Sequence, residues 1–141
     1  MTFFVDANVF VYSATQGPHR EACAEAILAI SRGQAAGLTS TAALEEVWFL
    51  EWSGKAGAIA GLTERAYAMT APLLPVGDAV FQRAFALDAP SLGPNDRLHV
   101  ATCIENDIEA ILSADAGFDS VDGLRRVDPL DRAGMAGLLA G

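Results

Sequence analysis

The sequence predicts an α/β fold in which a parallel sheet carries helices on both faces. Short apolar segments alternate along the chain with longer segments of helical spacing, which is the order of elements in parallel α/β sheets. The first apolar segment, Phe3–Val5, has two aromatic residues and one β-branched residue, as expected of a strand buried on both faces. It runs directly into Asp6, at the end of the strand where such sheets place their ligand sites.

Helices are expected where apolar residues recur at intervals of three and four, between capping residues and glycine or proline breakers. In chain order, the expected helices cover residues 8–15, 19–32, 41–51, 59–70, 79–87, 95–105 and 130–139. After Phe3–Val5, the expected strands are Gly37–Thr39, Leu73–Val76, Ile108–Ser113 and Arg126–Asp128. This alternation predicts right-handed crossovers between the parallel strands.

The composition indicates a globular protein. The chain has 141 residues, of which 52% are hydrophobic, and this is enough for one buried core. We therefore expect a single domain over residues 1–141. No charge-free stretch approaches the roughly 18 residues of a membrane span. The N-terminus lacks the basic start of a signal peptide, and Asp6 interrupts its apolar stretch, so the protein is expected in the cytoplasm.

The charge balance argues against a broad electrostatic grip on nucleic acid. The chain carries 18 acidic and 9 basic residues, for a net charge of −9. Nonspecific binding of nucleic acid depends on a basic surface. An enzyme that meets a phosphodiester through a bound cation remains compatible with this balance.

Four acidic residues share a predicted position at one edge of the sheet. Asp6 and Asp115 follow strands, whereas Glu46 and Asp96 lie in the first turns of helices, which face the carboxyl ends of parallel strands. Each also has a simpler explanation when taken alone. Asp6 or Asn8, like Asp96, can be a helix cap, Glu46 can be a solvated helix residue, and Asp115 can form a turn. Four acids at one sheet edge together indicate a shared site.

Such a cluster is expected to hold a divalent cation. Two carboxylates about 5 Å apart repel each other by about 3 kcal/mol at an effective dielectric constant of about 20. Clustered acids therefore raise their own pKa values or recruit a cation. With no nearby His or Cys at ligand spacing, the oxygen-only set favours Mg²⁺, with Mn²⁺ as the alternative. Such a metal can activate a water and neutralise charge on a phosphodiester.

Three segments resemble the PIN-domain family, and in particular the VapC-type toxins of bacterial toxin–antitoxin pairs. They are FFVDANVFVY, TSTAALEEVWFL and NDRLHVATCIENDIEAILSADAGFDSV. The resemblance implies a Rossmann-like three-layer α/β/α sandwich with a central parallel sheet. It also implies an Mg²⁺-dependent endoribonuclease that hydrolyses RNA with a metal-activated water. The expected partners are a cognate antitoxin protein and a second copy of the chain in a homodimer, with no membrane.

The resemblance also assigns roles to individual residues. Asp6 and Asp96 correspond to direct metal ligands, and Glu46 and Asp115 complete the catalytic acids, with Glu45 as the alternative to Glu46. Supporting residues are expected at three positions, where they hold the acids, contact phosphate or act as an outer ligand: Asn8, Ser113 and Asp119.

Two basic side chains near Asp96 have open roles. His99 is interpreted as a packed or surface residue rather than a catalyst. Arg97 can reach a phosphate, balance the acids or form a surface ion pair.

The segment from Trp48 to Trp52 has too many large apolar residues for one buried helix face, and we expect part of it to be exposed for dimer or antitoxin contacts.

Two other classes of function stay open. One is another Mg²⁺-dependent phosphoryl-transfer protein. A haloacid-dehalogenase-like phosphatase would have Asp-x-Asp where this chain has Asp6-Ala7-Asn8, and a receiver domain needs a late lysine whereas Lys55 is the only lysine. The other is a PIN-fold binding module without catalysis, which the set of four acids disfavours.

Overall fold

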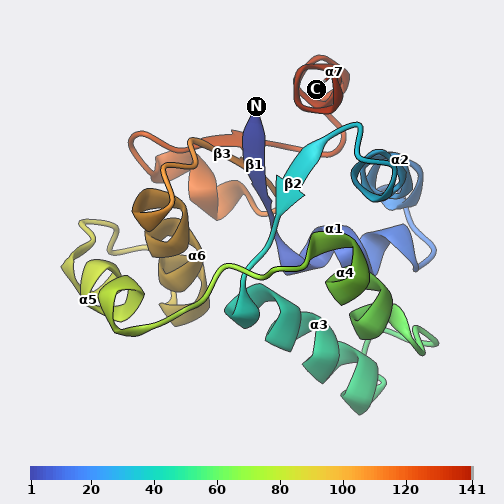
Figure 1. Cartoon of the computed structure of the whole chain (residues 1–141), viewed down its shortest axis with the longest axis horizontal. Coiled ribbons are helices and arrows are strands. Elements are labelled where there is room, and N and C mark those ends of the chain that lie inside the picture. The colour runs from blue at the N-terminus through green and yellow to red at the C-terminus, as the bar shows by residue number, and fades with distance from the viewer. Residues whose placement is uncertain (141) are drawn as a thin grey trace.

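The computed structural model describes residues 1–140, and its centre is a four-stranded parallel sheet (Figure 1). The strands are β1 (Thr2–Val5), β2 (Ala36–Leu38), β3 (Ala110–Leu112) and β4 (Arg125–Val127). Their order across the sheet is β2-β1-β3-β4, and every neighbouring pair is parallel. The predicted α/β class with a central parallel sheet is confirmed.

The strand order reverses between β1 and β3. The chain first moves from β1 to β2 on one side, and then returns past β1 to β3 on the other side. Such a reversal leaves a crevice at the carboxyl ends of the two strands, where open α/β sheets bind their ligands. Asp6 directly follows β1, and Ser113 directly follows β3, so both lie beside this crevice.

Helices cover both faces of the sheet. Along β1, Phe3 and Val5 pack into one core with α1 (Ala7–Ser13) and α2 (Arg20–Ser31), whereas Phe4 packs into the other core beside α6 (Pro94–Glu105). Alternate residues of a strand point to opposite faces, so three apolar residues in a row suit a strand that is covered twice. The remaining helices are α3 (Thr41–Ser53), α4 (Leu62–Thr70), α5 (Asp78–Ala86), the 3-10 helix η1 (Ala116–Ser120) and α7 (Arg132–Leu139).

The predicted strand at Leu73–Val76 is wrong. Leu74 makes a single bridge to Ser40, through the bonds Leu74 N to Thr39 O at 2.9 Å and Thr41 N to Leu74 O at 3.0 Å. Pro75 has no N–H with which to extend a ladder, which explains why the pairing stops there. The segment nevertheless ties the start of α3 in place.

Most predicted helix starts differ from the structure by one to three residues, and two of them show why. The helix expected from Ile59 begins at Leu62, where Glu51 of α3 accepts hydrogen bonds from the Gly61 and Thr63 amides at 2.8 and 2.9 Å. The helix expected over residues 79–87 begins one residue earlier, at Asp78, and Gly77 is its cap.

No helix within residues 1–140 is long and apolar enough to cross a membrane.

Candidate active site

Asp6 lies at the carboxyl end of β1, where the strand order reverses, and is held by three hydrogen bonds. Its Oδ1 accepts from the Ala7 amide at 2.7 Å, and its Oδ2 accepts from Ser113 Oγ at 2.6 Å and Asn8 Nδ2 at 3.2 Å. Asp6 is therefore both the cap of α1 and a member of the acidic site, so the two explanations weighed from the sequence are compatible. Burial raises the pKa of its carboxyl, while His99 and the Ser113 hydroxyl oppose that rise.

Ser113 and Asn8 connect β1 to the loop after β3. The Ser113 hydroxyl donates to Asp6 and accepts from the Asp115 amide at 3.0 Å and from Asn8 Nδ2 at 3.3 Å. Asn8 Oδ1 accepts from the Ala114 amide at 3.4 Å. The buried hydroxyl thus uses its donor and both acceptor positions, which fixes the distance between the two strand ends.

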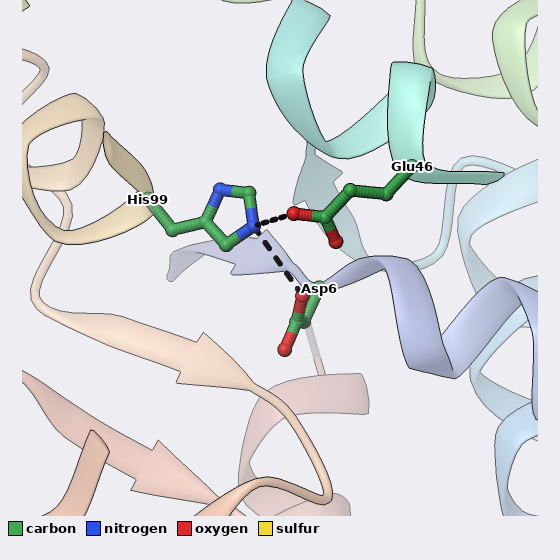
Figure 2. A group of neighbouring side chains, drawn as sticks. All are labelled: Asp6, Glu46 and His99. Atoms are coloured by element: carbon green, nitrogen blue, oxygen red, sulfur yellow. Dashed lines mark hydrogen bonds and ion pairs between the residues drawn. The ribbon is translucent and has the colours of Figure 1, made fainter. Parts of the chain in front are cut away.

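Glu46 reaches the site from the second turn of α3, and not from the first turn as expected, and it meets His99 from α6 (Figure 2). His99 Nε2 lies 3.1 Å from Glu46 Oε1 and 3.7 Å from Asp6 Oδ1. One ligand atom from each of these residues falls within 4.8 Å of the other two. Glu46 is half-buried and Glu45 is exposed, so it is Glu46 that the helix turns into this group.

Asp96 and Asp115 lie around this inner group. Asp96 is on the first turn of α6, one helical turn before His99. Burial, together with the nearby negative charges of Asp115, Asp6 and Glu46, raises the pKa of Asp96 to about 6, while His99 opposes the rise. Asp115 is exposed and caps η1 by accepting from the Gly117 amide at 2.9 Å.

Asp119 is engaged with Arg126, away from the inner group. Arg126 donates to both Asp119 oxygens at 2.8 and 3.1 Å, to Asp128 Oδ2 at 3.0 Å and to the Ser113 carbonyl at 3.0 Å. The hydrogen bonds from Arg126 lower the pKa of Asp119. Asp119 therefore orients the Arg126 guanidinium, which in turn donates a hydrogen bond to the backbone carbonyl of Ser113.

Arg97 takes none of the roles considered from the sequence. Its guanidinium donates to four backbone carbonyls, those of Ala84, Leu87, Ala89 and Leu92, at distances from 2.8 to 3.1 Å. These carbonyls belong to the end of α5 and the loop that leads to α6. Arg97 therefore holds the N-terminal end of the helix that carries Asp96.

His99 is the member of the site that the sequence interpretation missed. It was expected to be a packed or surface residue, and its side chain is indeed fully buried, but its ring contacts two of the acids. The available signal was its spacing, because residues three apart on a helix share a face and Asp96 precedes it by three. The expectation that no histidine lies near the acids is therefore wrong.

The residues present fit a divalent cation. Carboxylates that follow β1 and β3 and that project from α3 and α6 lie close enough for Asp115, Asp6 and Glu46 to raise the pKa of Asp96, in addition to the larger effect of burial. Carboxylate oxygens suit Mg²⁺ and Mn²⁺, and an imidazole nitrogen is acceptable to Mn²⁺ and to softer metals. The donor set therefore suits a divalent cation that prefers oxygen ligands, and Asp6 is a carboxylate that three hydrogen bonds hold in place.

Comparisons with known proteins agree with this architecture. The sequence model of the PIN domain matches residues 3–124. Among solved structures, the fold is similar to a chain in the crystal structure of VapBC2 from Rickettsia felis bound to a DNA fragment from their promoter. The TM-score is 0.62 with 13% sequence identity, over 91% of this chain and 98% of that one. A search of curated proteins found no match.

Proposed function

The chain belongs to the PIN domain family, and from this membership we propose that it is a metal-dependent endoribonuclease. PIN domains are generally nucleases, which supports hydrolysis of phosphodiester bonds. The observation that carries the proposal is the gathering of Asp6, Glu46, Asp96 and Asp115 at the point where the strand order reverses. RNA as the substrate and Mg²⁺, or Mn²⁺, as the cofactor are parts of the proposal.

Each acid has a proposed role. Asp6 and Asp96 bind the metal directly, and Glu46 and Asp115 complete the catalytic set. Asn8 and Ser113 support Asp6 by donating to its Oδ2, which leaves Oδ1 with the Ala7 amide as its one short donor. The metal, when bound, supplies a polarised water and offsets the charge of the phosphodiester.

The protein itself contributes position and charge. The short bond from Ser113 and the cap bond from Ala7 hold the Asp6 carboxylate in one orientation before any ligand arrives. Asp96 and Asp115 add negative charge, so the crevice disfavours a bare phosphate until cations have entered. Cations bound by these acids would let a chain of net charge −9 meet RNA at this edge of the sheet.

We further propose that the nuclease is the toxin of a toxin–antitoxin pair. The similar solved structure is named as a VapBC complex bound to promoter DNA, which supports an antitoxin as partner. A homodimer and a cytoplasmic location stay predictions. Trp48 and Trp52 of α3 are 65% and 79% exposed, so the predicted exposure of this segment is confirmed, and these side chains are available for dimer or antitoxin contacts.

The test is cleavage of single-stranded and structured RNA by the purified protein during a titration with Mg²⁺. Wild type should cut in Mg²⁺ and stop in EDTA. Asp6→Asn and Asp96→Asn should each lose at least about 100-fold in rate, the equivalent of about 3 kcal/mol of transition-state stabilisation. Asp122→Asn, an exposed acid outside the site, is the matched control and should keep wild-type activity.

Two results would contradict the proposal. Equal RNA decay with wild type and both site variants would identify a contaminating nuclease. Absence of cleavage by wild type on every RNA tested, with tight binding to a partner protein, would favour the binding module without catalysis.

A further inference from the structure

The role of His99 follows from which of its two ring nitrogens has a partner. Nε2 lies 3.1 Å from Glu46 Oε1, and Nδ1 has no hydrogen-bond partner within residues 1–140, although the side chain is fully buried. The ring packs against the buried ring of Phe4, with 5.4 Å between the centroids. Nε2 is therefore the ring nitrogen that contacts polar groups, and it faces the carboxylates of Glu46 and Asp6 (Figure 2).

With Glu46 ionised, the contact between its carboxylate and His99 requires a hydrogen on Nε2. Without it, a nitrogen lone pair would face a carboxylate oxygen at hydrogen-bond distance. If Nε2 instead bound a metal, the ring hydrogen would move to Nδ1 and become a buried donor without an acceptor. Histidines that bind metals almost always donate their other ring N–H to an acceptor, and buried N–H groups are rarely left unpaired.

Glu46 depends on this contact. Within residues 1–140, His99 is the only hydrogen-bond partner of the Glu46 carboxylate, whereas Asp6 has donors from Ala7, Asn8 and Ser113. Glu46 projects from the middle of an α-helix on a flexible side chain, so a donor is needed to hold it toward Asp6. His99 sits on the opposite side of the group, where α6 faces α3.

We propose that His99 is a positioning residue that donates from Nε2 to Glu46 and orients this acid for the metal, and that it is not itself a metal ligand. The inference rests on the proposed metal site and adds a role that the four acids alone do not imply. His99 and Asp96 share one face of α6, so one helix delivers both a candidate ligand and the donor that holds the acid opposite.

The test is binding of Mn²⁺ to the purified chain, followed by electron paramagnetic resonance in a nitrogen-free buffer, without RNA. His99→Leu should weaken Mn²⁺ binding about 10- to 100-fold, the usual effect of removing an outer-shell partner. His99→Gln, whose Nε2 can donate to Glu46, should recover most of the affinity. His19→Leu, which changes the other histidine of the chain, is the matched control and should bind like wild type.

A spectroscopic measurement on wild type keeps the test independent of how the variants fold. Pulsed resonance of bound Mn²⁺ should show no directly coordinated nitrogen-14. A nitrogen-14 hyperfine coupling as large as that of a directly coordinated nitrogen would overturn the proposal if it disappeared in His99→Gln. His99 would then be a metal ligand. Equal Mn²⁺ affinity in wild type and a folded His99→Leu would also overturn it. If wild type bound no Mn²⁺, the proposed function would fail as well.

Discussion

At the scale of single residues, burial and the neighbouring negative charges both disfavour the ionised form of Asp96. Its carboxylate accepts no hydrogen bond within residues 1–140, and it faces the negative charges of Asp115, Asp6 and Glu46. Its pKa rises from the ordinary value of 3.8 to about 6. The ionised form of Asp96 is therefore less favourable in the folded protein than in the unfolded chain.

Asp96→Asn should stabilise the metal-free protein at pH 7. The shift of the pKa to about 6 corresponds to roughly 3 kcal/mol in full, but Asp96 is partly exposed and solvent screens it, so we expect about 1 kcal/mol. The free energy of unfolding in urea with EDTA measures this gain. A less stable Asp96→Asn would show that the carboxylate makes a favourable contact in the folded state.

The same shift predicts a pH dependence with a definite sign. Between pH 3.8 and about 6, the unfolded chain releases the Asp96 proton while the folded protein keeps it, so Asp96 lowers stability as the pH rises through this window. Wild type in EDTA should therefore lose more stability between pH 4 and 6 than Asp96→Asn. Parallel curves of unfolding free energy against pH for the two proteins would contradict the assigned shift.

Ser113→Ala should destabilise the fold by about 1 to 3 kcal/mol. The substitution removes the 2.6 Å bond to buried Asp6 and the acceptor of the Asp115 amide, and it leaves both groups short of a partner. Urea unfolding measures the loss. Ser120→Ala is the matched control, because that hydroxyl makes an exposed bond to the Gly117 carbonyl. Equal stability of the two variants would argue against the structural role of Ser113.

The residues of the site divide into those that the sequence could reveal and those that it could not. Asp6 and Ser113 were recognisable because each follows a strand. The carboxyl ends of parallel strands lie at the same edge of the sheet, regardless of the segments that connect them. The contact between His99 and Glu46 joins two helices across the crevice, and no local pattern encodes it. The role of Arg97 was equally unpredictable, because the sequence does not distinguish an arginine that donates to four backbone carbonyls from one on the surface.

At the scale of elements, Arg97 links α5 to α6. Its four carbonyl partners lie between residues 84 and 92, so the guanidinium holds the loop before the helix that carries Asp96 and His99. A planar group with five donors can do this, whereas a lysine ammonium cannot reach the same set. The position of two site residues thus depends on a contact outside the site.

Arg97→Lys should destabilise the protein by about 2 to 3 kcal/mol, because bonds from a charged donor are each worth about 1.5 to 3 kcal/mol and do not add. Hydrogen exchange should accelerate most for amides of residues 87–93. Arg83→Lys is the control, since Arg83 makes one partly exposed ion pair with Glu105 at 3.0 Å. Unchanged exchange in the 87–93 loop would contradict this role of Arg97.

Element types were more predictable than element ends. The order of helices and parallel strands follows from apolar spacing, and Phe3–Val5 is buried on both faces as its composition indicates. Leu73–Val76 has the apolar character of a strand, but prolines at positions 72 and 75 leave it with one bridge. The start of α4 at Leu62 depends on Glu51 of another helix, a tertiary contact that spacing does not contain.

At the scale of the whole molecule, the exposed aromatic residues of α3 indicate association. Trp48 and Trp52 expose large apolar side chains to solvent. Trp48→Ala with Trp52→Ala should weaken self-association or antitoxin binding, as measured by sedimentation velocity. Phe85→Ala, on α5 and 80% exposed, removes a similar aromatic surface elsewhere and is the control. If the double variant assembled and bound antitoxin like wild type, Trp48 and Trp52 would have no role in either contact.

The central claim is that acids from four separate segments form one cation site at the crevice between β1 and β3. Calorimetric titration of the metal-free protein with Mg²⁺ tests it most directly. We predict saturable binding to wild type and to Asp122→Asn, and loss of that binding in Asp6→Asn and in Asp96→Asn. Undiminished Mg²⁺ binding in both site variants would contradict the claim.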